Sequence, residues 1–192
     1  MATESSEERT RLLEVLRKIL QSIGSVHDEW EIFETAVRES IRQFRYAWVS
    51  LVLEDLDEKT ARVFLSVPTA GEPLRTGEIV APESGFWEAM QSGRPFVRER
   101  LEDGAALWED AALRSLGVRA YVAIPITVRG KVIGTYNVGT RDAAGLGESL
   151  GWMTLLAEFL ANAVLAARLL REVQEGLARL RDKAARMPLM ST

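Results

Sequence analysis

The stretch from Val118 to Thr140 constrains the fold of this chain more than any other, because it contains two apolar runs around the dipeptide Arg129-Gly130. Two such runs separated by a two-residue break that contains glycine predict a β-hairpin. If Val128 pairs with Lys131, one face of the hairpin is aliphatic and the other mixes aromatic with small residues. The aliphatic face carries Val122, Ile124, Ile126, Ile133 and Thr135, and the mixed face carries Tyr121, Ala123, Pro125, Gly134, Tyr136 and Val138.

In this register Pro125 lies opposite Gly134. A proline lacks the backbone donor that a strand needs, and a glycine fills little volume. Such a pair therefore marks either a bulge in a core strand or a place where something approaches the backbone. The hairpin alone leaves both interpretations open.

The composition predicts one globular domain with helical extensions. The chain has 192 residues, of which 47% are hydrophobic and 27% are charged, and domains typically run to about 100–200 residues. A net charge of -4 argues against a nucleic-acid partner. No apolar run approaches the ~20 residues of a membrane span, and the polar, acidic N-terminus is unlike a signal peptide. We expect a cytoplasmic protein that binds neither nucleic acid nor membrane.

The residue types that carry most catalytic and metal chemistry are scarce. The chain has no cysteine, which excludes disulfides, thiolate nucleophiles and thiolate metal sites. The single histidine, His27, lies in a short polar link and cannot supply a two-histidine metal site. Glycine-rich phosphate loops are missing, and no nucleophile with a partner base is visible. We expect no metal, no cofactor and no enzyme activity.

The remaining elements follow from periodicity and turn residues. The strand predicted over 46–54 places Trp48 and Ser50 on the same face. Four aromatic residues, Phe86, Trp87, Phe96 and Trp108, gather in the segment before the hairpin. They form either a small core beneath short helices or the wall of a partly open pocket. Helices are predicted over 4–22, 28–44, 82–91, loosely over 102–115, and over 147–186; further strands are predicted over 61–67 and 95–97, with a short irregular one over 74–81.

The end of the long last helix carries a narrow apolar seam. Leu170, Val173, Leu177 and Leu180 follow one another at spacings of three, four and three, with charged residues around them. That spacing is typical of the a and d positions of a coiled coil. A seam of about two and a half heptads is marginal alone. It therefore predicts a partner helix, from the N-terminal segment or from a second subunit.

This order of elements predicts an α+β domain. We expect a largely antiparallel sheet of about five or six strands, with the terminal helices bundled on one face. Short helices and loops would cover a pocket on the other face. The stretch 85–142 resembles the second half of a GAF domain. Ser92-Gly93-Arg94-Pro95 matches the family's helix end before a strand. LGVRAYVAIPITVRGKVIGTYNV, residues 116–138, matches its characteristic strand pair.

The resemblance covers roughly residues 28–166 and implies a PAS-related sensory or regulatory module, dimeric through its terminal helices. It implies an N-terminal amphipathic helix over 1–24, a GAF domain over 25–166, a signalling helix over 167–187 and a tail over 188–192. The dimer and signalling residues would be Leu12, Leu16, Ile19, Leu170, Val173, Leu177 and Leu180. The family places its pocket on the mixed face of the hairpin, which favours a pocket floor there. By position, the pocket-lining candidates are Trp48, Ser50, Phe86, Trp87, Phe96, Trp108, Leu113, Tyr121, Ala123 and Tyr136.

The departures from the family narrow the function. The Asn-Lys…Phe…Asp-Glu motif of cyclic-nucleotide-binding members is absent, since Val138 follows Asn137. Without cysteine, neither bilin attachment through a thioether nor the methionine-sulfoxide reductase chemistry of this fold is available. Haem ligation by His27 is disfavoured because that residue falls outside the pocket segment. Cofactor-free sensing of an unknown small molecule remains, with the signal passed to an output domain or partner regulator of bacterial signal transduction or transcription. The alternative is a ligand-free dimerisation and protein-interaction module. The chain ends soon after Pro188, which we interpret as a fragment of a longer regulator rather than a stand-alone module.

Overall fold

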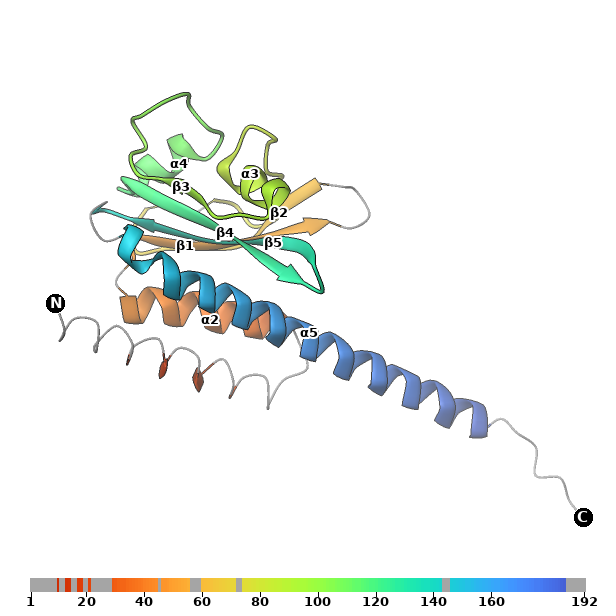
Figure 1. The fold of residues 1–192 in the computed structure, drawn as a ribbon. Helices are drawn as coiled ribbons and strands as arrows, with labels where there is room; N and C mark the ends of the chain where they lie inside the picture. Colours follow the sequence, from red (N-terminus) through yellow and green to blue (C-terminus); the bar gives the residue numbers. More distant parts are fainter. Residues whose placement is uncertain are drawn as a thin grey trace, which may run out of the picture.

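The computed structural model describes residues 10, 13–14, 17–18, 21, 29–44, 46–55, 60–71, 74–142 and 146–185. It consists of an antiparallel sheet with two layers of helices (Figure 1). In chain order the elements are α2 (Glu29–Phe44), β1 (Trp48–Asp55), β2 (Thr60–Pro68), α3 (Gly85–Ser92), β3 (Phe96–Arg98), α4 (Asp110–Ser115), β4 (Ala120–Val128), β5 (Lys131–Thr140) and α5 (Leu146–Ala185).

The sheet has five strands in the order β2-β1-β5-β4-β3, and every neighbouring pair is antiparallel. Helices α2 and α5 lie on one face, and α3 and α4 lie on the other (Figure 1). This arrangement confirms the α+β class predicted from the order of elements. The irregular strand predicted over 74–81 is a single bridge, between Arg62 and Ile79.

The core between the sheet and the terminal helices, which we call the helix-side core, follows from the helical period. In α2, Ile32, Phe33 and Val37 fall on one side of the helix and are fully buried. In α5, Leu156 and Leu160 do the same, one turn apart. Each such side chain contributes about 1.5–3 kcal/mol when it is removed from water. The central strands contribute Val49, Leu51, Val122, Ile124, Ile126, Tyr136 and Val138 to this core.

A β-bulge in the hairpin changes its predicted register. Thr127 pairs with Val132, but Ile126 pairs with Gly134, so Ile133 has no partner on β4. From that point the pairing is offset by one residue, and a shift of one residue exchanges the two faces of a strand. The prediction that Tyr136 and Val138 share the mixed face with Tyr121 is therefore wrong. Both lie in the helix-side core, and Thr135 and Asn137 take their places on the opposite face.

Gly134 is where two strands approach most closely. A Cβ at this position would overlap the carbonyl oxygen of Val52 and come within 2.8 Å of the Leu53 side chain. The group that approaches the backbone here is therefore β1. For Gly134 the bulge interpretation of the Pro125–Gly134 pair is correct and the pocket-floor interpretation is wrong.

The segments at both ends are described in part. Residues 10, 13–14, 17–18 and 21 are helical, and Lys18 forms an ion pair of 3.0 Å with Glu39 on α2. Leu12, Leu16, Ile19, His27 and the tail over 188–192 lie outside the described residues. Helix α5 continues well beyond the sheet (Figure 1). Within the described ranges, no helix is both long enough and apolar enough to cross a membrane.

Candidate functional site

The face of the sheet beneath α3 and α4, which we call the pocket face, begins with an aromatic row across the strands. Trp48 on β1 pairs with Gly139 on β5, which pairs in turn with Tyr121 on β4. Gly139 has no side chain, and Val118 and Trp48 occupy the space that a Cβ would take there. Phe86 of α3 contacts both rings of the row, with its ring centroid 6.0 Å from that of Trp48 and 5.8 Å from that of Tyr121.

The next row along the strands is polar. Ser66, Ser50, Asn137 and Ala123 lie side by side on β2, β1, β5 and β4. The Trp48 indole donates a hydrogen bond of 2.8 Å to Ser66 Oγ, and Asn137 Nδ2 donates one of 3.1 Å to Ser50 Oγ. We call this row the polar floor.

Two polar atoms, one in this floor and one beside it, lack hydrogen-bond partners among the described residues. They are Asn137 Oδ1 and Thr135 Oγ1. Both residues are fully buried. Helix α3 packs over β5, the strand that carries them: a Cβ built on Gly93, at the end of α3, would lie 3.9 Å from the side chain of Val132. A buried polar group normally has a hydrogen-bond partner, so these two atoms are exceptions on this face.

Helix α3 covers this face because its ends are fixed locally. Ser84 is extended and its side chain accepts a hydrogen bond from the backbone N–H of Trp87, which caps the helix. Gly93 adopts the left-handed conformation at the other end, with φ of 65°, and its N–H bonds to the carbonyl of Ala89. The helix end predicted at Ser92-Gly93 is thereby confirmed. These caps hold Phe86 and Ala89 against the sheet.

A carboxylate is buried at the beginning of α3. Glu109 precedes α4 and is fully buried. Its Oε1 accepts a hydrogen bond of 2.8 Å from the N–H of Gly85, the first residue of α3, and another from the Tyr121 hydroxyl. Gly85 is required here, because a Cβ would overlap both the Phe96 ring and the Tyr121 hydroxyl. The N-terminus of a helix favours negative charge. Glu109 Oε2 has no hydrogen-bond partner among the described residues.

The neighbouring acid is paired. Asp110 Oδ2 lies 3.1 Å from Arg98 Nη2 and accepts a hydrogen bond of 2.9 Å from the N–H of Leu107. Arg98 also donates to the carbonyl of Ala105. These bonds tie β3, the connecting loop and α4 together. Of the two buried carboxyl groups, Asp110 is paired with Arg98, and Glu109 has no ion pair among the described residues.

The surroundings disfavour charge at Glu109. Burial raises the pKa of Glu109, although the hydrogen bond from Tyr121 opposes the shift. Burial also raises the pKa of the Tyr121 hydroxyl, and the nearby Glu109 carboxylate adds to that effect. Both groups therefore hold their protons more firmly than they would in water.

The structure brings most of the predicted pocket residues together. All of them except Tyr136 lie on the pocket face. Tyr136 belongs to the helix-side core, where its hydroxyl lies beside Ser40 of α2, so its assignment to the pocket is wrong. The buried members are Trp48, Ser50, Phe86, Leu113, Tyr121 and Ala123, and the half-buried ones are Trp87, Phe96 and Trp108. Their roles in binding remain predictions.

The rings on the pocket face also contact one another. The Phe86 centroid lies 6.5 Å from that of Trp108, and the Phe96 centroid lies 5.9 Å from that of Tyr121. Edge-to-face contacts at such distances stabilise a core. The aromatic set thus serves at least as the small core that the sequence offered as the alternative to a pocket wall.

Three residues of the site were missed from the sequence. Thr135 and Asn137 reach the pocket face only because of the bulge, which no turn residue announces. Glu109 stands in a segment predicted as loosely helical over 102–115, where an acid is ordinarily solvated. The structure forms a helix only over Asp110–Ser115, and the loop before it carries Glu109 inward.

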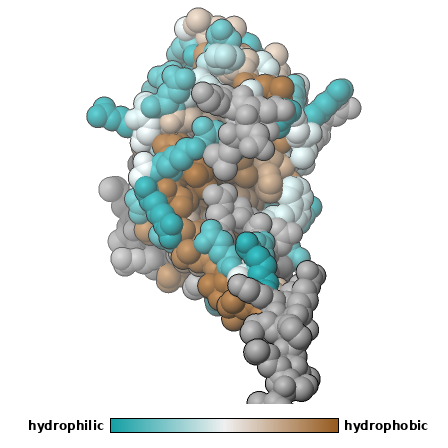
Figure 2. Space-filling view, turned by 90° about the vertical axis from the view of Figure 1, so that its right-hand side faces the viewer, coloured by the Kyte–Doolittle hydropathy of each residue, from teal (hydrophilic) through white to brown (hydrophobic). Residues whose placement is uncertain are grey.

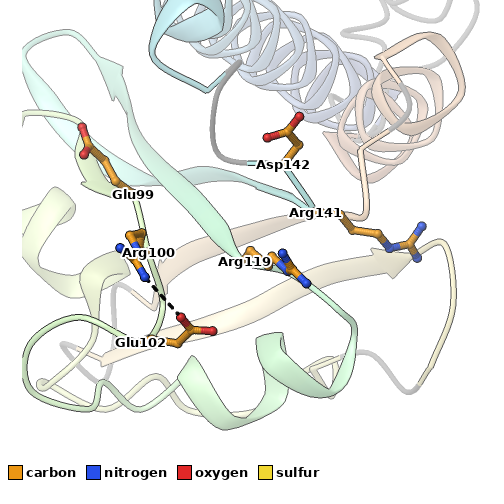
Figure 3. A pocket seen from close by; sticks show the side chains of 6 residues that line it. All are labelled: Glu99, Arg100, Glu102, Arg119, Arg141 and Asp142. Atoms are coloured by element: carbon orange, nitrogen blue, oxygen red, sulfur yellow. Dashed lines mark ion pairs between the residues drawn. The ribbon is translucent and has the colours of Figure 1, made fainter.

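A surface hollow of about 260 Å³ lies where β3 and β5 end and β4 begins (Figure 3). Arg100 faces Glu102 at 3.7 Å, and Figure 3 shows Arg141 turned away from this pair. The six lining side chains carry three positive and three negative charges. Exposed pairs of this kind contribute little energy, so we assign the hollow no binding role. It is lined by Glu99, Arg100, Glu102, Arg119, Arg141 and Asp142.

The described ranges contain no group of three or more histidine, cysteine, aspartate or glutamate residues placed to hold a metal ion. The site therefore consists of hydrogen-bonding groups, aromatic rings and one unpaired carboxyl.

The sheet order and the two unlike helical layers define an α+β domain of the PAS-related class. A family model described as the GAF domain matches residues 28–164, and the chain belongs to the GAF domain family, as the sequence motifs predicted. No curated protein matches the sequence.

Several solved structures share the fold at low sequence identity. The phycoerythrobilin-bound GAF domain of a cyanobacterial phytochrome has a TM-score of 0.68 at 14% identity, covering 85% of this chain and 99% of that one. The GAF domain of a phosphoenolpyruvate-protein phosphotransferase from Coxiella burnetii has a TM-score of 0.66 at 16% identity, with coverages of 83% and 96%.

An enzyme has the same fold. The free methionine-R-sulfoxide reductase of Neisseria meningitidis, in complex with its substrate, has a TM-score of 0.66 at 17% identity, covering 82% of this chain and 90% of that one. The scaffold therefore accommodates catalysis, although the family is mostly regulatory. The present sequence contains no cysteine.

Proposed function

We propose that this GAF domain senses a small molecule on its pocket face and passes the state of that site through α5 to an output domain or partner regulator. The polar floor carries the proposal. Asn137 Oδ1 and Thr135 Oγ1 are buried without partners among the described residues, and each such group costs about 1–3 kcal/mol. A ligand that supplies hydrogen-bond partners beneath α3 recovers that free energy.

Two of the similar structures contain a bound small molecule. The phytochrome domain is bound to phycoerythrobilin, and the reductase is bound to its substrate. Both are similar to this chain in fold alone. They indicate that the scaffold holds small molecules of different chemistry, so the residues of each chain decide what is bound.

Strand β4 offers a physical route for the signal. Tyr121 and Ala123 face the pocket side, whereas Val122 and Ile124 alternate with them and belong to the helix-side core. Leu156 and Leu160 of α5 are members of that core. A ligand that displaces β4 therefore changes the packing of α5. Such coupling requires that the ligand bind two arrangements of α5 with different affinity.

The test is an unbiased search for the ligand, followed by one matched pair of variants. Mass spectrometry of what copurifies and a thermal-shift screen of metabolites provide candidates. A true ligand at about 100 times its Kd adds roughly 2.7 kcal/mol to the free energy of unfolding. The variant Asn137→Ala should lose most of this stabilisation. Asn162→Ala, on the exposed side of α5, should keep it. Absence of any stabilising or copurifying compound would contradict the proposal.

The relay is tested separately. Spin labels at Val173 in a dimer should report a different distance when the pocket-face ligand is present. Equal distances with and without that ligand would remove the relay and leave the binding site standing.

A ligand-free dimerisation module is the second candidate. It is favoured by the mutual contacts of the aromatic rings and by the exposed seam of α5, where Leu177 and Leu180 are 52% and 64% exposed. This candidate expects a stable dimer whose thermal stability responds to no metabolite. A single compound that stabilises the chain through Asn137 decides against it.

A further inference from the structure

The charges buried above the pocket face do not balance. Glu109 and Asp110 are 0% and 1% exposed. The groups that face the Glu109 carboxyl are the Tyr121 hydroxyl on β4, the backbone N–H groups of Gly85 and of Glu109 itself, and the adjacent Asp110. Arg98 on β3 is the nearby cation, and it bonds to Asp110 and to the Ala105 carbonyl. In the described part of the chain, no lysine or arginine pairs with Glu109.

A purely structural role explains only one of the two oxygens of the Glu109 carboxyl group. Oε1 satisfies the first N–H of α3 and the Tyr121 hydroxyl. A glutamine could accept the same two bonds without bringing a charge into the interior. Oε2 remains without a partner in the described part of the chain. An uncompensated charge in the interior is strongly unfavourable unless the group is protonated or meets a cation.

The rings around Glu109 suit a cation as well. Phe86 and Phe96 both contact Tyr121, and Trp108 precedes Glu109 in the chain and contacts Phe86. Phe96 and Trp108 are half-buried, so part of each side chain is accessible at the rim of the site. Aromatic faces attract ammonium groups, most strongly where water is excluded.

We propose that Glu109 is the specificity residue of the site and that it binds the protonated amine of the sensed ligand, a compound with a cationic nitrogen on an aromatic or apolar body. The ammonium group donates to Glu109 Oε2, and the body of the ligand packs on the rings beside it. This inference rests on the proposed sensory function and names the ligand class of that site.

The charge count also gives the proton balance. Without ligand, burial raises the pKa of Glu109 and favours a proton on its carboxyl group, while Asp110 is paired with Arg98. When an ammonium group binds, that proton leaves to solvent and the carboxylate takes the cation in its place. The affinity for a cationic ligand therefore rises with pH across the titration of Glu109.

Three probes of similar size and different charge test the proposal on the full chain: benzylamine, benzyl alcohol and benzoate. Calorimetric titration should show benzylamine binding at least about tenfold more tightly than the other two, which corresponds to about 1.4 kcal/mol. The variant Glu109→Gln should remove this preference. Glu88→Gln, an exposed acid on α3, should preserve it.

A second measurement needs no variant. Benzylamine binding to the unchanged protein, measured over a series of pH values in two buffers of different ionisation enthalpy, should release protons, and fewer of them as the pH rises through the titration of Glu109. This measurement tests the proposal even if Glu109→Gln fails to fold.

The inference is overturned if benzoate or benzyl alcohol binds as tightly as benzylamine, if none of the three binds, or if no proton is released. Those results leave the sensory function intact when a neutral or anionic metabolite stabilises the chain through Asn137. Failure of every compound overturns both proposals.

Discussion

At the scale of single residues, the side chain that departs most from ordinary behaviour is Glu109. Glutamate is rarely buried without a cation, yet this one lies beneath α3 with one oxygen bonded and the other unpartnered in the described part of the chain. The Gly85 amide and the Tyr121 hydroxyl orient it. Glu109 therefore has a local role, since it bonds the first N–H of a helix. Its other carboxyl oxygen stays available to a proton or a ligand.

Replacing this carboxyl changes how stability depends on pH. Because burial raises the folded-state pKa of Glu109 above 4.5, the native state holds its proton more firmly than the unfolded chain. The stability it contributes is full below about pH 4.5 and is lost as pH rises through the folded-state pKa. Urea unfolding should be measured at a series of pH values. The free energy of unfolding of Glu109→Gln should increase relative to that of the natural protein as pH rises, by at most about 1.4 kcal/mol per pH unit.

Glu88→Gln provides the comparison, since this acid is exposed on α3. Its unfolding free energy should run parallel to that of the natural protein across the same range. Parallel behaviour of Glu109→Gln as well would show that the carboxyl titrates normally in the folded state.

The residue scale is also where sequence reasoning reached its limit. Trp48, Phe86 and Tyr121 were predictable members of the pocket face because alternation along strands and helical spacing assign faces. Asn137 and Glu109 were not, because their positions depend on a bulge and on an irregular loop. Neither feature has a period, and short loops are set by tertiary contacts that one sequence does not display.

At the scale of elements, the contact between the hairpin and β1 determines which residue can stand at position 134. The bulge at Ile133 brings Gly134 opposite both Ile126 and Leu53. The close approach of the β1 backbone leaves no room for a side chain. The proline and the glycine of the hairpin thus indicated an irregular strand correctly, but the sequence could not tell which partner approaches.

A methyl group tests this contact. Gly134→Ala should destabilise the protein by about 1–3 kcal/mol in urea unfolding, because the added Cβ meets backbone that cannot move aside. Gly151→Ala on α5 has no heavy atom within 4 Å of its Cβ. It should stabilise by about 0.5–1 kcal/mol, as expected for glycine replaced in a helix. Similar effects at the two positions would contradict this account of the strand contact.

At the scale of the whole molecule, α5 joins a buried half to an exposed half. Met153, Leu156 and Leu160 are fully buried against the sheet, whereas Leu170 and Val173 are 45% and 59% exposed. Figure 2 shows apolar side chains on the surface where this helix leaves the body of the domain. The exposed seam has the spacing of a two-helix contact, and a homodimer through α5 stays our prediction.

Charge placed in the seam should separate the subunits. Leu177→Asp combined with Leu180→Asp should convert a dimer into a monomer in sedimentation equilibrium, with an unchanged circular dichroism signal from the sheet. The control is Gln174→Asp combined with Ala178→Asp, two exposed positions of the same helix outside the seam. A double seam variant that remains dimeric would exclude α5 as the interface.

The edges of the sheet bear on how such subunits can meet. Outside β2, the segment after it covers the beginning of the edge, through bonds of 2.9 Å from Val63 N to Glu78 O and 2.8 Å from Val80 N to Ala61 O. At the other edge, β3 has only three residues. Long unpaired strands are templates for aggregation, and short or covered ones are not. The covered part of β2 and the short β3 therefore offer little template for fibril growth.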